Sequence, residues 1–156
     1  MKVIFLEVDG VLNTPSSPAR CGEYVGIDDD KVVRLKRIVE RTKAKIVLIS
    51  AWKKYWRKEA ELKPLQDFFA NYLDEKLEKC GLKAFDKTQE KANGKYLLRR
   101  DGIQRYVQGN GVENYVILAE SSLGYVGAGK EKLVKTNQSR GLTDEQVTRV
   151  NQMLLQ

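Results

Sequence analysis

Acidic and hydroxyl side chains follow three apolar segments of this 156-residue chain. Glu7 and Asp9 lie at the end of the first segment, Ser50 ends the second, and Glu120 with Ser121 follows the third. Carboxylates can transfer protons, and their oxygen atoms bind hard cations. These residue types therefore permit carboxylate chemistry with a hard cation, or binding without catalysis.

The composition removes most other kinds of catalytic site. The chain has no histidine and only two cysteines. It therefore lacks a Ser-His-Asp triad, a Cys-His pair, an imidazole base and the common zinc sites that need His or four Cys. Two cysteines are also too few for a disulfide framework, which indicates a reducing compartment and a cytoplasmic location.

The elements that must position these side chains alternate between strand and helix. Nearly continuous apolar runs predict buried strands at residues 2–8, 45–50 and 115–118. Apolar residues at helical spacing predict helices at residues 28–42, 64–80, 100–108 and 143–154. Residues 13–30 hold two prolines and several Gly and Ser residues, which favours a flap. We expect one α/β domain over residues 1–156, with a mainly parallel sheet whose strand ends meet in one crevice.

Taken in order, these strand ends resemble the haloacid dehalogenase-like (HAD) phosphohydrolase family. The first, second and fourth motifs correspond to residues 3–13, 46–52 and 116–120, and the third motif is a cation among Lys95, Arg99 and Arg100. The start at residues 9–13 and the closing residues 133–137 and 141–143 are similar to the small HAD domains of multi-enzyme RNA-repair proteins.

This resemblance implies a three-layer Rossmann-like sheet, capless or with the small flap, and a Mg²⁺-dependent phosphatase acting on phosphorylated nucleotide or polynucleotide ends. In such enzymes one carboxylate attacks phosphorus and an acid two residues on protonates the leaving oxygen. Glu7 and Asp9 match this catalytic pair. The matches to the phosphate-binding groups are Ser50, Arg99 and Arg100, and those to the metal ligands are Glu7, Asp9 and Glu120.

The motifs also depart from the family pattern. Glu7 stands where the family has Asp, and the fourth motif reads Ala119-Glu120-Ser121-Ser122-Leu123-Gly124 without neighbouring acids. Displacement on the order of 1 Å at a reacting centre can cost about 10²-fold in rate. We therefore expect weakened or lost turnover. A catalytically degenerate HAD-fold module that binds nucleic acid or an acidic partner, and a phosphatase for small metabolites, remain as alternatives.

Positive charge is concentrated in one stretch of the chain. The formal net charge is +7, and residues 31–58 contain eleven Lys and Arg residues and one acid. This excess favours an anionic partner, although a solvated helix face is the alternative. Aromatic and cationic side chains alternate there as they do in single-stranded nucleic-acid sites, at Trp52, Lys53, Lys54, Trp56 and Arg57. Alternatively, the two Trp residues, at positions i and i+4, pack into the core.

No segment approaches the roughly 20 apolar residues that a membrane helix needs. The first residues have neither the apolar length nor the cleavage site of a signal peptide. The expected partners are a phosphorylated substrate and, through the basic stretch, nucleic acid. The sequence does not indicate an oligomeric state.

Overall fold

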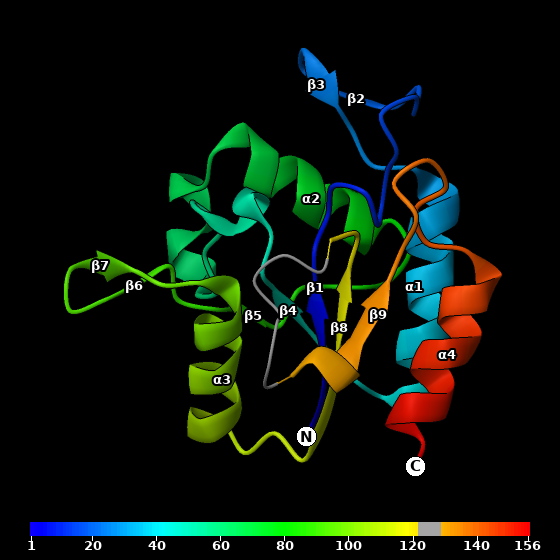
Figure 1. Cartoon of the computed structure of the whole chain (residues 1–156). Helices are drawn as coiled ribbons and strands as arrows, with labels where there is room; N and C mark the ends of the chain where they lie inside the picture. The colour runs from blue at the N-terminus through cyan, green and yellow to red at the C-terminus, as the bar shows by residue number, and fades with distance from the viewer. Residues whose placement is uncertain (122–128) are drawn as a thin grey trace.

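A five-stranded parallel sheet forms the centre of the protein (Figure 1). The computed structural model describes residues 1–121 and 129–156. The strands lie in the order β5-β4-β1-β8-β9, and every neighbouring pair is parallel. Their bounds are β1 (Lys2–Leu6), β4 (Lys45–Leu48), β5 (Asp86–Lys87), β8 (Asn114–Ala119) and β9 (Leu133–Lys135). The predicted parallel sheet is confirmed.

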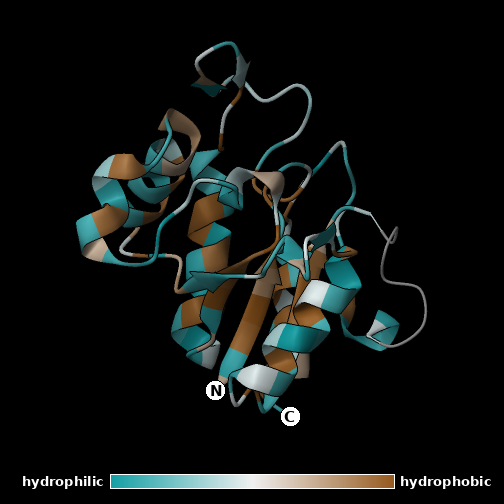
Figure 2. Ribbon diagram, turned by 90° about the vertical axis from the view of Figure 1, so that its left-hand side faces the viewer, coloured by the Kyte–Doolittle hydropathy of each residue, from teal (hydrophilic) through white to brown (hydrophobic). Residues whose placement is uncertain are grey.

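Helices cover both faces of this sheet. One face of β1, including Ile4 and Leu6, packs with α1 (Asp29–Thr42), α2 (Phe68–Glu78) and α4 (Asp144–Leu154). The other face, including Val3 and Phe5, packs with α3 (Arg99–Gly109). Successive side chains of a strand point to opposite faces, so β1 is apolar throughout. Figure 2 shows the apolar residues gathered on the sheet and on the helix faces turned toward it. The structure therefore has the predicted three layers.

The helix boundaries follow local capping chemistry. Thr143 and Gln146 form the capping box that opens α4. The Asp67 carboxylate accepts a hydrogen bond from the N–H of Ala70 and opens α2. The helix predicted from Pro64 therefore begins at Phe68, and Pro64 lies in the preceding 3₁₀ helix η2 (Ala60–Leu65). None of the described helices has the length and apolar character to cross a bilayer.

Two short hairpins stand outside the central sheet. The predicted flap, residues 13–30, carries β2 (Arg20–Cys21) and β3 (Tyr24–Val25). The second hairpin, β6 (Lys91–Ala92) and β7 (Lys95–Tyr96), lies between the helices predicted at residues 64–80 and 100–108, where no strand is predicted. Two-residue strands are too short to show the alternation from which strands are predicted.

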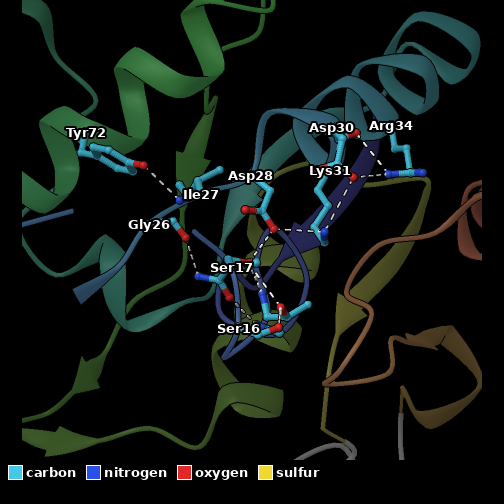
Figure 3. A network of polar contacts seen from close by, with 12 residues as sticks. Ser16, Ser17, Gly26, Ile27, Asp28, Asp30, Lys31, Arg34 and Tyr72 are labelled. Carbon is cyan, nitrogen blue, oxygen red and sulfur yellow. Dashed lines mark hydrogen bonds and ion pairs between the residues drawn. The ribbon is translucent and has the colours of Figure 1, made fainter. Parts of the chain in front are cut away.

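Buried polar contacts fix the base of the flap (Figure 3). The Ser17 hydroxyl donates a 2.6 Å hydrogen bond to the Asp28 carboxylate, and the Lys31 ammonium lies 3.0 Å from the same group. Ser17 also accepts a 2.8 Å hydrogen bond from the N–H of Thr14. The flap is therefore anchored to the first turn of α1.

Candidate functional site

The predicted acidic and hydroxyl residues meet at the carboxyl edge of the sheet. The parallel strands β1, β4 and β8 end at this edge, and backbone hydrogen bonds between neighbouring segments continue just beyond the strand ends. The N–H of Glu7 donates to the carbonyl of Leu118 (3.0 Å), and the N–H of Ile49 donates to the carbonyl of Leu6 (3.0 Å). These bonds place the end of β1 between the ends of β4 and β8. Ser50 and Glu120 therefore flank the segment that carries Glu7 and Asp9.

Glu7 forms an ion pair across the sheet edge. Its Oε1 accepts from the Arg99 guanidinium at the first residue of α3, while its side chain remains only 14% exposed. Its Oε2 is buried without a hydrogen-bond partner among the described residues. A buried acceptor without a partner is costly, so this oxygen is suited to a bound cation or proton donor.

Asp9 has neutral hydrogen-bond donors instead. Its Oδ1 accepts from the Asn13 amide (3.0 Å), and its Oδ2 accepts from the Trp52 indole N–H (3.1 Å). Asn13 also accepts from the N–H of Gly10 (2.9 Å) and donates to the carbonyl of Gly26 (2.9 Å). Asn13 thus joins the turn after β1 to the flap. Asn13 is not among the predicted site residues, although an Asn three residues after an Asp-Gly turn is a recognisable turn residue.

Glu120 lies against the same turn. Gly10 has φ +82°, and a Cβ added there would come within 2.6 Å of the Glu120 Cβ. A side chain at residue 10 would therefore clash with Glu120 as well as strain the backbone. The Thr136 hydroxyl donates a 2.7 Å bond to the carbonyl of Gly10 and secures the turn from the β9 side. Ser122, Leu123 and Gly124 of the fourth motif lie outside the described residues.

A pocket of about 220 Å³ lies beside Ser50 and Arg99. Ser50 is buried, and its hydroxyl accepts a 3.1 Å bond from the N–H of Trp52. Lys53 and Thr88 also line the pocket, where the Lys53 ammonium donates a 3.0 Å bond to the Thr88 hydroxyl. Two cations and one acid, Glu90, therefore line the pocket together with the hydroxyl groups of Ser50, Thr88 and Tyr96, and the excess of positive charge suits an anionic ligand.

Burial controls the charge of Lys53. The pKa of its ammonium is lowered to about 8, mainly by burial; Glu90 raises it, and the positive charges of Arg99 and Lys87 contribute to the lowering. Lys53 therefore remains mostly protonated at neutral pH. An anion in the adjacent pocket would raise this pKa, because an opposite charge favours the protonated form.

Arg99, rather than Arg100, faces Glu7. The Arg100 side chain is partly exposed, and its Nε lies 3.6 Å from the Asp101 carboxylate. Lys95, the third cation considered, is exposed on the β6–β7 hairpin. Of the three candidates for the cation of the third motif, the structure therefore places Arg99 at the site, a choice that the sequence left open.

The structure does not support the predicted nucleic-acid stacking on the two Trp side chains of the basic stretch. Trp52 and Trp56 are only 9% and 1% exposed and belong to the larger core cluster, so neither ring is a free stacking surface. Lys53 is also buried, which leaves Lys54 and Arg57 as the predicted nucleic-acid contacts nearer the surface. The interleaved pattern arises because both Trp side chains pack inward, Trp52 from the 3₁₀ turn at Ala51–Lys53 and Trp56 from the residues after it.

Acids from outside the basic stretch offset much of its charge. Arg34 is paired with Asp30 and Asp144, and Arg37 is also paired with Asp144. Lys31 is buried against Asp28. The cations of α1 therefore do not combine with Lys54 and Arg57 into one uncompensated basic face.

The described residues contain no group of three His, Cys, Asp or Glu side chains that could hold a metal ion. Glu7, Asp9 and Glu120 are therefore not assembled as a three-carboxylate site, and both Asp9 oxygens already accept hydrogen bonds. Mg²⁺ commonly uses one or two carboxylates together with water and substrate phosphate. The orphaned Oε2 of Glu7 fits the role of one such ligand.

Comparison with known proteins gives one family. The model of the HAD domain in Swiss Army Knife RNA repair proteins matches residues 3–147. The match includes nearly all of the central sheet, the flap and every predicted site residue. No curated protein matches the chain.

Proposed function

Because the chain belongs to the family of HAD domains in Swiss Army Knife RNA repair proteins, we propose that it is a Mg²⁺-dependent phosphatase domain with weakened turnover. Its substrate is the phosphorylated end of a nucleotide or polynucleotide. The observation that supports this most directly is the ion pair between Glu7 and Arg99, which lines a pocket together with Ser50 and Lys53.

The pocket residues bind the phosphate group. The Ser50 hydroxyl, the Lys53 ammonium and the Arg99 guanidinium are donors toward phosphate oxygens, and the two cations compensate the charge that develops during transfer. Lys53 is held ready by its bond to Thr88, so it needs little reorganisation when the ligand enters.

Glu7 and Asp9 carry out the transfer. A carboxylate oxygen of Glu7 forms a bond to phosphorus as the bond to the leaving oxygen breaks, and Asp9 gives that oxygen a proton. Asp9 then takes a proton from water, whose oxygen displaces the phosphate from Glu7. Asn13 and Trp52 hold the Asp9 carboxylate in a fixed orientation for both steps.

Mg²⁺ would be held by Glu7, with Glu120, the residue after β8, as a second acid, and by phosphate oxygens and water. When bound, it neutralises phosphate charge. The partnerless Oε2 of Glu7 supports this assignment.

The Glu7–Arg99 ion pair explains why turnover is weak. The guanidinium neutralises the carboxylate that must attack, and the extra methylene of Glu brings that carboxylate out to the cation. A shift on the order of 1 Å at the reacting atoms costs about 10²-fold in rate. Asp at position 7 would draw the carboxylate back toward β1.

Release of inorganic phosphate from 5′- and 3′-phosphorylated oligonucleotides tests the proposal. We expect slow, Mg²⁺-dependent release by the unaltered chain and faster release by Glu7→Asp and by the Glu7→Asp, Glu120→Asp double variant. Asp9→Asn in either background is the matched control and reduces the rate of release at least about 10²-fold. Release that persists without Mg²⁺, or that is as fast in Asp9→Asn as in its parent, rejects the proposed chemistry.

The same ion pair favours a second candidate, a module that binds phosphorylated ends without turnover. Neutralisation of Glu7 reduces repulsion of phosphate while Lys53 and Arg99 still attract it. Such binding weakens with added salt, because phosphate contacts release counterions. No activity in the double variant, together with salt-sensitive binding that Lys54→Glu reduces, supports this candidate over the phosphatase.

A further inference from the structure

A series of aromatic rings runs from Asp9 to the tip of the flap. It begins at Trp52, whose indole N–H binds Asp9. The ring centroid of Trp52 lies 5.5 Å from that of Phe69, which lies 5.3 Å from Tyr24 and 4.1 Å from Phe68. Trp52 is buried, whereas Tyr24 and Phe68 are 61% and 55% exposed. We call Tyr24, Phe68 and Phe69 the aromatic ledge.

The flap holds the ledge in place. The hairpin β2–β3 stands above the carboxyl edge of the sheet, next to α2 (Figure 1). The N–H of Ile27 donates a 3.1 Å bond to the hydroxyl of Tyr72 on α2, and Figure 3 shows this contact beside the anchored flap base. A Cβ at Gly22 would already touch the Phe68 ring at 3.4 Å. The exposed rings are therefore presented by a braced segment, as expected of a binding surface.

The ligand is indicated by what lies on the two sides of Asp9. On one side, Lys53 and Arg99 line a pocket suited to an anion, and on the other the apolar ledge begins. A molecule that occupies both the pocket and the aromatic ledge has a phosphate group joined to a flat ring by a short spacer. Nucleobases stack on aromatic side chains whatever their sequence, because every base has a π-face.

We propose that Tyr24 and Phe68 stack the base of the leaving nucleoside, so that the site selects nucleoside phosphates over sugar phosphates. This inference rests on the proposed function for the place of the phosphate. Asp9, as the proton donor to the leaving oxygen, then faces the leaving nucleoside, and the ledge starts at its partner Trp52. The base is thereby held beside the acid that completes its release.

The other hairpin offers a rival position for the base. Tyr96 on β7 is 78% exposed and lines the phosphate pocket. The Lys91 ammonium lies 4.5 Å from its ring centroid and covers one face. Tyr96 also stands on the Arg99 side of the site rather than the Asp9 side. The ledge therefore suits the leaving group better, and Tyr96→Ala serves as the matched comparison.

Calorimetric binding of three probes to the full chain tests the inference. The probes are adenosine 5′-monophosphate, ribose 5-phosphate and inorganic phosphate, each with Mg²⁺. We expect the base to tighten binding about tenfold over ribose 5-phosphate, as one stacked base does. Tyr24→Ala and Phe68→Leu should reduce this ratio toward one and leave ribose 5-phosphate binding unchanged. Tyr96→Ala and the remote Leu155→Ala should preserve the ratio.

Equal affinities for the nucleotide and the sugar phosphate in the unaltered chain overturn the inference. The inference is also overturned if Tyr96→Ala abolishes the preference for adenosine 5′-monophosphate over ribose 5-phosphate while Tyr24→Ala retains it. If inorganic phosphate and ribose 5-phosphate fail to bind while the nucleotide binds through Tyr24, the ledge stands and the phosphate pocket of the proposed function is rejected. If no probe binds, both are rejected.

Discussion

Two carboxylates separated by one residue stand in opposite surroundings. Glu7 faces the α3 side of the site, where it pairs with Arg99 close to the buried ammonium of Lys53. Asp9 faces the flap side, where two neutral groups, the Asn13 amide and the Trp52 indole, donate to it. Arg99 fixes the carboxylate of Glu7, and Asn13 with Trp52 fixes that of Asp9, but only Arg99 offsets the charge of the carboxylate that it binds.

The difference indicates how one site divides its roles. Neutral donors orient Asp9 without placing a charge beside it, which suits a group proposed to give and then take a proton. A cationic partner makes Glu7 and Arg99 a neutral unit, which under the proposed function must separate before Glu7 attacks. Under the same proposal, the cationic flank governs phosphate binding and the neutral flank governs proton transfer. The following changes test this division, beginning with the largest expected effect.

Asp9→Asn should reduce phosphate release about 10²- to 10⁴-fold, which is the usual contribution of a positioned acid–base group. The amide cannot exchange the proton, although its size is the same. Single-turnover release in the Glu7→Asp background gives the rate, and phosphate titration checks that binding is retained. A loss of phosphate binding equal to the loss of rate would show that Asp9 belongs to the binding flank instead.

Lys53→Met should weaken phosphate binding roughly tenfold or more at pH 7, as expected when a charged hydrogen bond is lost. In the unaltered chain, phosphate affinity should fall as the pH rises through the pKa of Lys53, which is about 8 in the ligand-free protein and higher with phosphate bound. Lys53→Met should lack this step, and the exposed neighbour Lys54→Met should keep it. Identical pH profiles for the unaltered chain and Lys53→Met would place Lys53 outside the binding flank.

Lys53 should also make stability depend on pH. Its pKa is lowered in the folded chain from 10.5 to about 8, so between these values the unfolded chain binds the proton that the folded chain lacks. The Lys53 contribution to the free energy of unfolding therefore rises with pH over this interval. Urea unfolding at pH 7 and pH 9.5 should show this gain relative to Lys53→Met. A difference between the two proteins that does not change with pH would contradict it.

Asn13→Ala should lower the free energy of unfolding by about 1–3 kcal/mol, because it leaves buried backbone groups without partners. Those groups are the N–H of Gly10 and the carbonyl of Gly26. Phosphate release should fall with it, while phosphate affinity stays constant, since Asn13 acts on the Asp9 flank. Urea unfolding and phosphate titration measure the two effects. Weaker phosphate binding in Asn13→Ala would break the separation of the flanks.

The main elements of the fold could be predicted because their signals are local. The apolar run of β1 and the capping box at Thr143 are each contained within a few residues. Elements without such a signal could not be predicted. The edge strands β5 and β9 have two and three residues, and they form only because β4 and β8 offer them partners.

The candidate site divides in the same way. The motif positions of Glu7, Asp9 and Ser50 could be found from the strand ends, since parallel strands bring those ends together. The contacts that assign roles join residues far apart in the chain. The Trp52–Asp9 bond spans 43 residues and the Lys53–Thr88 bond spans 35, and spacing within the basic stretch carries no information about either.

Trp52→Phe should produce the smallest change and isolate the neutral flank most cleanly. Phe keeps most of the core packing but lacks the N–H that binds Asp9, and a single neutral hydrogen bond contributes about 0.5–1.5 kcal/mol. We expect phosphate release to slow by roughly two- to tenfold, with phosphate affinity and its pH dependence unchanged. Steady-state kinetics in the Glu7→Asp background separate the two quantities, and Trp56→Phe, whose indole binds Asp74 instead, is the matched control. If both Trp variants slow release equally, the effect belongs to core packing; if only Trp52→Phe does, the indole N–H orients the acid.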